Sequence, residues 1–150
     1  MPGALDGIVV LDFTRLLPGP FCTQLLANLG ADVIKVEDPQ LGDYMRSVPP
    51  LVDGVSYPFI MVNRGKRSLA VDLKTPEGQD ILRKLARGAD VVVEQFRPGV
   101  MARLGADYDS LAIMNPRLVY CSFSGYGQTG PYKDLPGHDL NFEALAGILA

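Results

Sequence analysis

Short apolar runs alternate with helical segments along this chain, and the alternation restricts the fold more than any other feature. Residues 7–13 (GIVVLDF) form an apolar run between turn residues, which is typical of a buried parallel strand. After a Pro-Gly-Pro turn, leucines at helical spacing predict a helix that ends at Gly30, and residues 31–36 (ADVIKV) predict a second strand. Strand, helix and strand in succession make a βαβ unit, which is right-handed.

The rest of the chain continues the pattern. We expect strands at 68–73, 90–93 and 118–123, and helices at 76–87, 100–104, 108–114 and 141–150. Residues 42–62 hold three prolines and are predicted to be a long connection, of a length that is usually functional when ordered. The sequence thus predicts an α/β fold, one Rossmann-like domain over residues 1–150 with a mostly parallel sheet and flanking helices. Ligands of such sheets bind beyond the carboxyl ends of the strands.

Composition excludes several classes of function. The net charge is −3 and the pI about 5.0, so we expect no nucleic-acid partner and no attraction to an anionic membrane. No signal peptide or long apolar segment is evident. The two cysteines lack metal-binding spacing, which favours reduced thiols in a cytoplasmic protein and no metal site. The final helix carries no stop signal, so the chain is predicted to be cut from a longer one.

The first βαβ unit invites a dinucleotide-binding interpretation, because Glu37 stands where an acid would bind a ribose. The turn after the first strand, residues 13–20 (FTRLLPGP), lacks the G-x-G-x-x-G pattern. Its two prolines also remove amides that would hold a pyrophosphate. This turn therefore argues against a nicotinamide or flavin site.

Basic residues gather in an otherwise acidic chain between positions 63 and 74. Arg64, Lys66, Arg67 and Lys74 stand against one acid, Asp72, which gives a local charge of +3. A cluster of this kind just before a strand suits phosphate groups. A solvated loop is the alternative, since charge runs are common on surfaces.

A second candidate site follows the most apolar strand, at residues 94–99 (EQFRPG). Phe96 could stack on an adenine, and Arg97 or Arg103 could bind phosphate. The alternative is a turn with a buried aromatic residue. The position at the carboxyl end of the sheet favours a functional role.

The chain's single histidine, His138, lies ahead of the final helix, which Asp139 is expected to cap. A lone histidine is more often structural, but one beside a carboxylate at a helix start is suited to general acid–base chemistry. The glycine-rich residues 124–131 precede it and lack the G-K-[ST] of a P-loop. They form either a flexible connection or a loop that folds over a ligand.

Four ordered blocks resemble one family. Residues 5–37 (LDGIVVLDFTRLLPGPFCTQLLANLGADVIKVE), 63–78 (NRGKRSLAVDLKTPEG), 89–105 (ADVVVEQFRPGVMARLG) and 115–131 (NPRLVYCSFSGYGQTGP) are similar to the CaiB/BaiF family, the family III CoA-transferases. The resemblance implies the N-terminal part of a Rossmann-like large domain that binds coenzyme A. It also implies an acyl-CoA substrate and two subunits interlocked as a homodimer.

The resemblance places the nucleotide end of coenzyme A near Lys74, Phe96 and Arg103, and its adenine against Leu16 and Leu17. Some members carry arginine just after the second strand, where this chain has Asp38. We therefore expect the basic residues 64–67 to compensate for that arginine.

The family contains two chemistries. Transferases form an acyl anhydride on an aspartate that is expected beyond Ala150. Racemases of 2-methylacyl-CoA use a histidine in a G-H-D-[IL]-N-[YF] motif, which residues 137–142 (GHDLNF) match. The resemblance thus favours racemisation with His138 and Asp139 at the catalytic site, and CoA transfer to a free carboxylate is the first alternative. A fragment that binds coenzyme A without activity is the second.

Overall fold

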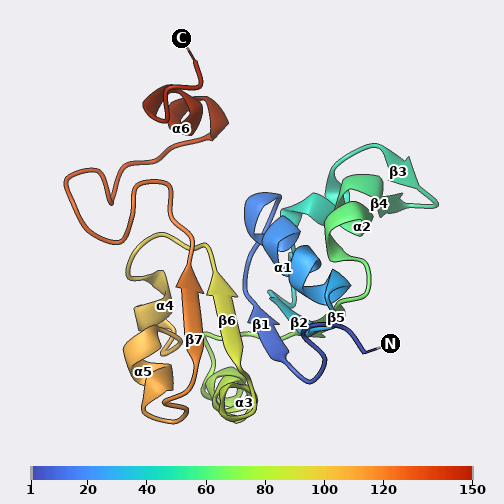
Figure 1. Ribbon diagram of the computed structural model, residues 1–150, viewed down its shortest axis with the longest axis vertical. Coiled ribbons are helices and arrows are strands. Elements are labelled where there is room, and N and C mark those ends of the chain that lie inside the picture. Colours follow the sequence, from blue (N-terminus) through green and yellow to red (C-terminus); the bar gives the residue numbers. More distant parts are fainter. Residues whose placement is uncertain (1, 150) are drawn as a thin grey trace.

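A computed structural model describes residues 2–149, and these residues form a five-stranded sheet with helices on both sides, together with a separate two-stranded hairpin (Figure 1). The main strands are β1 (Val9–Asp12), β2 (Asp32–Glu37), β5 (Arg67–Ala70), β6 (Val91–Glu94) and β7 (Val119–Ser122). The main helices are α1 (Pro18–Asn28), α2 (Tyr57–Asn63), α3 (Pro76–Arg87), α4 (Val100–Arg103), α5 (Tyr108–Ala112) and α6 (Asp139–Leu145).

The five strands are all parallel and lie in the order β5-β2-β1-β6-β7. The chain builds outward from β1 to β2 and β5, then returns to β6 on the other side of β1. The order therefore reverses between β1 and β6, and ligands of such sheets bind at the carboxyl ends beside this point. The predicted α/β class with a mostly parallel sheet is confirmed.

The sheet is buried on both faces because neighbouring residues of each strand point to opposite sides. Val10, Val33 and Val93 face α1, whose Leu26 and Ala27 pack on them. Leu11, Ile34, Val36 and Val92 face the other way, toward Leu82 of α3, Met101 of α4 and Leu111 of α5. Figure 1 shows α1 and α2 on one side and α3, α4 and α5 on the other.

Helix α3 begins as the sequence predicts. Thr75 caps it, its Oγ1 accepting the Gly78 amide proton at 3.1 Å, and Pro76 opens the first turn. The strands near positions 70, 90 and 120 differ from the predicted ranges by a few residues. Residues 71–73, for example, continue the alternating pattern after β5 has ended.

The predicted long connection over residues 42–62 contains secondary structure that the sequence analysis did not predict. The segment holds a 3₁₀ turn (η1, Tyr44–Ser47), a two-stranded hairpin (β3, Leu51–Val52; β4, Val55–Ser56) and most of α2. Ser56 caps α2 by accepting the amide proton of Phe59 at 3.3 Å, and Pro58 lies in the first turn. A proline in a first turn favours a helix, so the sequence contained the signal for α2.

The C-terminal helix is shorter than predicted and begins earlier, at Asp139. Its N-cap residue is His138 and not Asp139, and the His138 amide donates to Asn141 Oδ1 at 3.0 Å. None of its residues is buried. Figure 1 shows α6 at the end of a long connection, well away from the sheet. The predicted end at Ala150 lies outside the described residues.

Candidate functional site

A cleft of about 590 Å³ lies at the carboxyl edge of the sheet. Its walls come from segments that follow β1, β2, β5 and β6, and from α4. The apolar lining is formed by Phe13, Val36, Leu41, Tyr44, Val71, Leu73, Phe96, Val100 and Leu104. The charged lining is formed by Arg15, Glu37, Asp38, Asp72, Lys74 and Arg103. The structure thus brings three of the predicted site residues, Lys74, Phe96 and Arg103, to one cleft.

The three cations of the cleft are free to meet an anion. Within residues 2–149, Arg15, Lys74 and Arg103 have no carboxylate within ion-pair distance, although the chain holds five other ion pairs. Lys74 and Arg103 are exposed and Arg15 is half-buried. Three unpaired cations beside aromatic rings form a surface that suits a phosphorylated ligand with a planar base.

Arg15 is a cleft residue that sequence reasoning missed. Its guanidinium carbon lies 5.1 Å from the ring centroid of Phe96 and 5.6 Å from that of Tyr44, within cation–π range. The two rings are contributed by segments far from Arg15 in the chain. The available signal was position alone, because Arg15 follows β1 at the point where the strand order reverses.

Two carboxylates of the cleft, Glu37 and Asp38, accept hydrogen bonds from other groups of the protein. Glu37 accepts from Arg46 Nη2 at 2.6 Å and Nε at 2.8 Å, and from Ser68 Oγ at 2.9 Å. Burial alone would raise the pKa of Glu37, but these hydrogen bonds and the charge of Arg46 lower it from 4.5 to about 2. Asp38 Oδ1 accepts the amide protons of Gln40 and Leu41. Both oxygens of Glu37 are therefore engaged, which agrees with the argument against a ribose-binding role.

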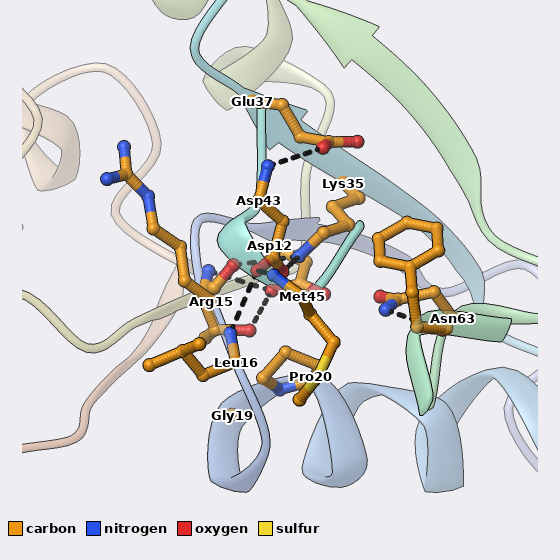
Figure 2. A network of polar contacts seen from close by, with 12 residues as sticks. Asp12, Arg15, Leu16, Gly19, Pro20, Lys35, Glu37, Asp43, Met45 and Asn63 are labelled. Carbon is orange, nitrogen blue, oxygen red and sulfur yellow. Dashed lines mark hydrogen bonds and ion pairs between the residues drawn. The ribbon is translucent and has the colours of Figure 1, made fainter. Parts of the chain in front are cut away.

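A buried polar network lies beneath the turn that carries Arg15 (Figure 2). Asp12, at the end of β1, is fully buried and pairs with Lys66 at 3.0 Å. Lys35 pairs with Asp43 at 2.9 Å, again with both side chains buried. Burial would raise the pKa of Asp12, but Lys66, Lys35 and two threonine hydroxyls outweigh it and lower the pKa. Figure 2 shows the Arg15 side chain extending away from this network.

The basic segment 64–67 does not line the cleft. The Lys66 side chain is only 2% exposed, and its amino group is committed to Asp12. Arg67 pairs with Asp32 at 3.0 Å, and Arg64 donates to the Met61 carbonyl oxygen at 3.2 Å. The structure thus separates these three residues from Lys74, with which the sequence grouped them.

Leu16 and Leu17 lie on the surface next to Arg15 and are 42% and 57% exposed. Arg97 lies in a second, smaller hollow of about 250 Å³ together with Glu94, Tyr108 and Gln128. Burial raises the pKa of Glu94, although hydrogen bonds from Ser122 and from the Phe96 amide oppose the rise. Phe96 therefore lines the main cleft and Arg97 lines the smaller hollow, although they are neighbours in sequence.

His138 and Asp139 are exposed at the start of α6, and neither lines the cleft. The loop that precedes them packs through aromatic contacts. Tyr126 meets Phe142 edge-on at 5.3 Å and Tyr132 at 6.0 Å between centroids. The loop and α6 thus form one small aromatic unit, and His138 is the N-cap residue of its helix.

Between positions 2 and 149, no three His, Cys, Asp or Glu side chains gather in a way that could hold a metal ion. Over the same range, no helix has both the length and the apolar character that a bilayer crossing requires.

Comparison with known proteins gives close relatives over nearly the whole chain. A succinate–glutarate CoA-transferase of Agrobacterium fabrum is 48% identical over 97% of this chain and 38% of its own length. The human α-methylacyl-CoA racemase is 43% identical over 98% of this chain and 35% of its own length. The crystal structure of a CaiB/BaiF family protein from Brucella suis superimposes with a TM-score of 0.93 at 44% identity, over 99% of this chain and 40% of that one.

The chain therefore spans less than half the length of the proteins it matches. The profile of the family described as CoA-transferase family III matches residues 5–150. The resemblance drawn from the four sequence blocks is confirmed, and the chain belongs to CoA-transferase family III.

Proposed function

We propose that this chain is the N-terminal, coenzyme A-binding part of an enzyme that acts on acyl-CoA thioesters. The observation that carries the proposal is the cleft, where three unpaired cations and two aromatic rings meet at the carboxyl edge of the sheet. The relatives support it, because their names describe a CoA-transferase and an acyl-CoA racemase.

The cleft fits the nucleotide end of coenzyme A. Lys74, Arg103 and Arg15 are the cations that would bind its phosphates, since charge-assisted hydrogen bonds to phosphate are the strongest that these side chains make. The adenine would lie along the aromatic wall beside Phe96, and Leu16 and Leu17 would cover its edge. Leu16 and Leu17 do not line the cleft either, but they directly follow Arg15, which does. Arg64, Lys66, Arg67 and Arg97 neither line the cleft nor adjoin Arg15 in the chain, and they are left out of this proposal.

For the reaction, the Gly137-His138-Asp139 motif supports racemisation at the α-carbon of the acyl group. Neutral imidazole is a suitable base near pH 7, and His138 would remove the α-proton. An acid on the opposite face would return the proton, and donors around the thioester oxygen would stabilise the enolate. His138 is exposed in this chain, so a further part of the enzyme would close over it.

Transfer of coenzyme A from an acyl-CoA to a free carboxylate is the second candidate. The observation in its favour is the higher identity to the Agrobacterium transferase, 48% against 43% for the racemase. An assay of α-deuterium exchange in the complete enzyme separates the two. Loss of deuterium without any acceptor acid supports racemisation, and strict dependence on a carboxylate acceptor supports transfer.

The assembly and location stay predictions: an interlocked homodimer in the cytoplasm. One surface supports the dimer. Four apolar residues recur at four-residue spacing on α1 and its two cap positions, and each is about half exposed: Leu17, Phe21, Leu25 and Leu29. Apolar stripes of this kind are usually covered by protein.

Calorimetric titration with coenzyme A tests the binding part of the proposal. Lys74→Ala and Arg103→Ala should each weaken binding about tenfold, and in the complete enzyme Arg103→Ala should raise KM more than it lowers kcat. Lys84→Ala provides the control, because Lys84 is a cation on α3 outside the cleft. Unchanged affinity in both cleft variants would remove the nucleotide from this site.

A further inference from the structure

The turn between β1 and α1, residues 14–17, has a backbone that needs external support. Leu16 has a φ of 61°, in the left-handed region that residues with a side chain rarely occupy. Leu16 directly follows Arg15, so its backbone conformation helps to set the position of Arg15 relative to α1. A strained residue of this kind persists only where its surroundings hold it in place.

Three side chains from distant segments hold the backbone of this turn. Lys35 Nζ donates to the Thr14 carbonyl oxygen at 2.8 Å, and Gln95 Nε2 donates to the Arg15 carbonyl oxygen at 2.6 Å. The Leu16 amide donates to Asp43 Oδ1 at 3.1 Å. The backbone of each of these three consecutive residues is thus held by a side chain, and the Thr14 amide also donates to Asp12 Oδ1 at 2.9 Å.

Asp43 connects most of these contacts. Its Oδ1 accepts the Leu16 amide and also the Met45 amide, at 2.9 Å, and its Oδ2 lies 2.9 Å from Lys35 Nζ. Its own amide donates to Glu37 Oε2 at 3.0 Å, which ties it to the end of β2. Both side chains of the Lys35–Asp43 pair are almost fully buried, at 2% and 1% exposure.

Asp43 is also adjacent in the chain to an aromatic residue that contacts Arg15. The next residue, Tyr44, lines the cleft, and its ring lies under the Arg15 guanidinium. Asp43 itself does not line the cleft. Any effect of Asp43 on a ligand there must therefore pass through residues that do line the cleft, and Arg15 is the cation among those it helps to hold.

We propose that Asp43, ion-paired with Lys35, is a positioning residue that holds Arg15 in the cleft for the phosphates of coenzyme A. This inference rests on the proposed function of the cleft. A purely structural ion pair would stabilise the fold without influencing one particular ligand contact. The positioning role instead predicts that the effect of Asp43 on binding disappears when Arg15 is absent.

A double-mutant cycle on coenzyme A affinity tests this coupling. Calorimetric titration would compare the parent, Arg15→Ala, Asp43→Asn and the double variant. We expect each single change to weaken binding about tenfold, and the double variant to bind no more weakly than Arg15→Ala alone. Equal losses from Asp43→Asn with and without Arg15 would overturn the proposal, as would unchanged affinity in Asp43→Asn.

A second variant guards against misfolding, since Asp43→Asn leaves Lys35 buried without a partner charge. Lys35→Met combined with Asp43→Asn removes both charges together and should show the same dependence on Arg15. Asp80→Asn is the matched control, because Asp80 pairs with Arg83 on the exposed side of α3. It should leave coenzyme A affinity unchanged.

The cleft variants distinguish this proposal from the proposed function. If Lys74→Ala and Arg103→Ala weaken binding but Arg15→Ala does not, the positioning role of Asp43 is wrong and the cleft remains the nucleotide site. If none of the three changes the affinity, the proposed function itself fails.

Discussion

Lys66 and Lys74 offer a comparison between a structural and a ligand-facing cation. Lys66 Nζ lies 3.0 Å from Asp12 Oδ2, 2.9 Å from the Pro20 carbonyl oxygen, 2.7 Å from Thr23 Oγ1 and 3.0 Å from Asn63 Oδ1, so its three protons are shared among four acceptors. Lys74 is exposed and has no ion pair within the part of the chain that the structure describes. We predict that Lys66→Met destabilises the fold and that Lys74→Met does not.

The size of the effect follows from the burial of the pair. Lys66→Met leaves Asp12 at 0% exposure without its partner charge, and breaking a buried pair in this way costs about 3–5 kcal/mol. Domains of this kind are stable by about 5–15 kcal/mol in total. A loss of that size should lower Tm by about 6–20 °C.

Urea unfolding followed by circular dichroism measures the loss, and the midpoint should fall at an unchanged slope. Lys74→Met should stay within about 0.5 kcal/mol of the parent, as exposed substitutions do. Asp12→Asn together with Lys66→Met should recover part of the stability, because it removes both buried charges. A cost below about 1 kcal/mol for Lys66→Met, or weaker coenzyme A binding at full stability, would refute the buried position of Lys66.

Three further predictions concern stability and catalysis. Because the pKa of Glu37 falls from 4.5 to about 2, its stabilisation is complete above pH 4.5 and is lost as the pH falls toward 2. The pKa shift gives an upper limit of about 3 kcal/mol, and screening at the partly exposed Arg46 reduces it to about 1–2 kcal/mol. Urea unfolding of Glu37→Gln should therefore differ from the parent by this amount at pH 7 and converge with it near pH 2. Gly19→Ala should cost about 1–3 kcal/mol in urea unfolding, because its methyl group would collide with Thr14 and Gln95, whereas Gly88→Ala meets only ordinary contacts and should change stability little. In the complete enzyme, His138→Ala should abolish α-deuterium exchange and leave coenzyme A affinity within about tenfold, and equal loss of both would indicate a structural histidine.

The sheet could be predicted from sequence because its strands are buried on both faces. A strand such as β6 appears as an uninterrupted apolar run, Val91-Val92-Val93, since both of its sides contact helices. The hairpin of β3 and β4 gave no such signal, because each strand has only two residues and most of their side chains are exposed. Helix α2 was missed because Pro58 suggested a loop, although a proline also fits a first helical turn.

The cleft could be predicted in part because position carries information in a parallel sheet. Lys74, Phe96 and Arg103 all follow the carboxyl ends of strands, and such ends meet at one edge. Arg15 follows a strand end as well, but its role depends on aromatic contacts with Tyr44 and Phe96. No local pattern shows that these three residues meet.

The basic segment shows why a local charge count misleads, and what would correct it. A buried carboxylate is stabilised by a partner cation or by hydrogen bonds, so an acid at a strand end can remove a basic residue from those available to a ligand. Asp12 ends β1 and Glu37 ends β2, and both are buried in the structure. They take Lys66 and Arg46 respectively. The cations that remain for an anion at this edge of the sheet are those that line the cleft and have no ion pair within residues 2–149, namely Arg15, Lys74 and Arg103.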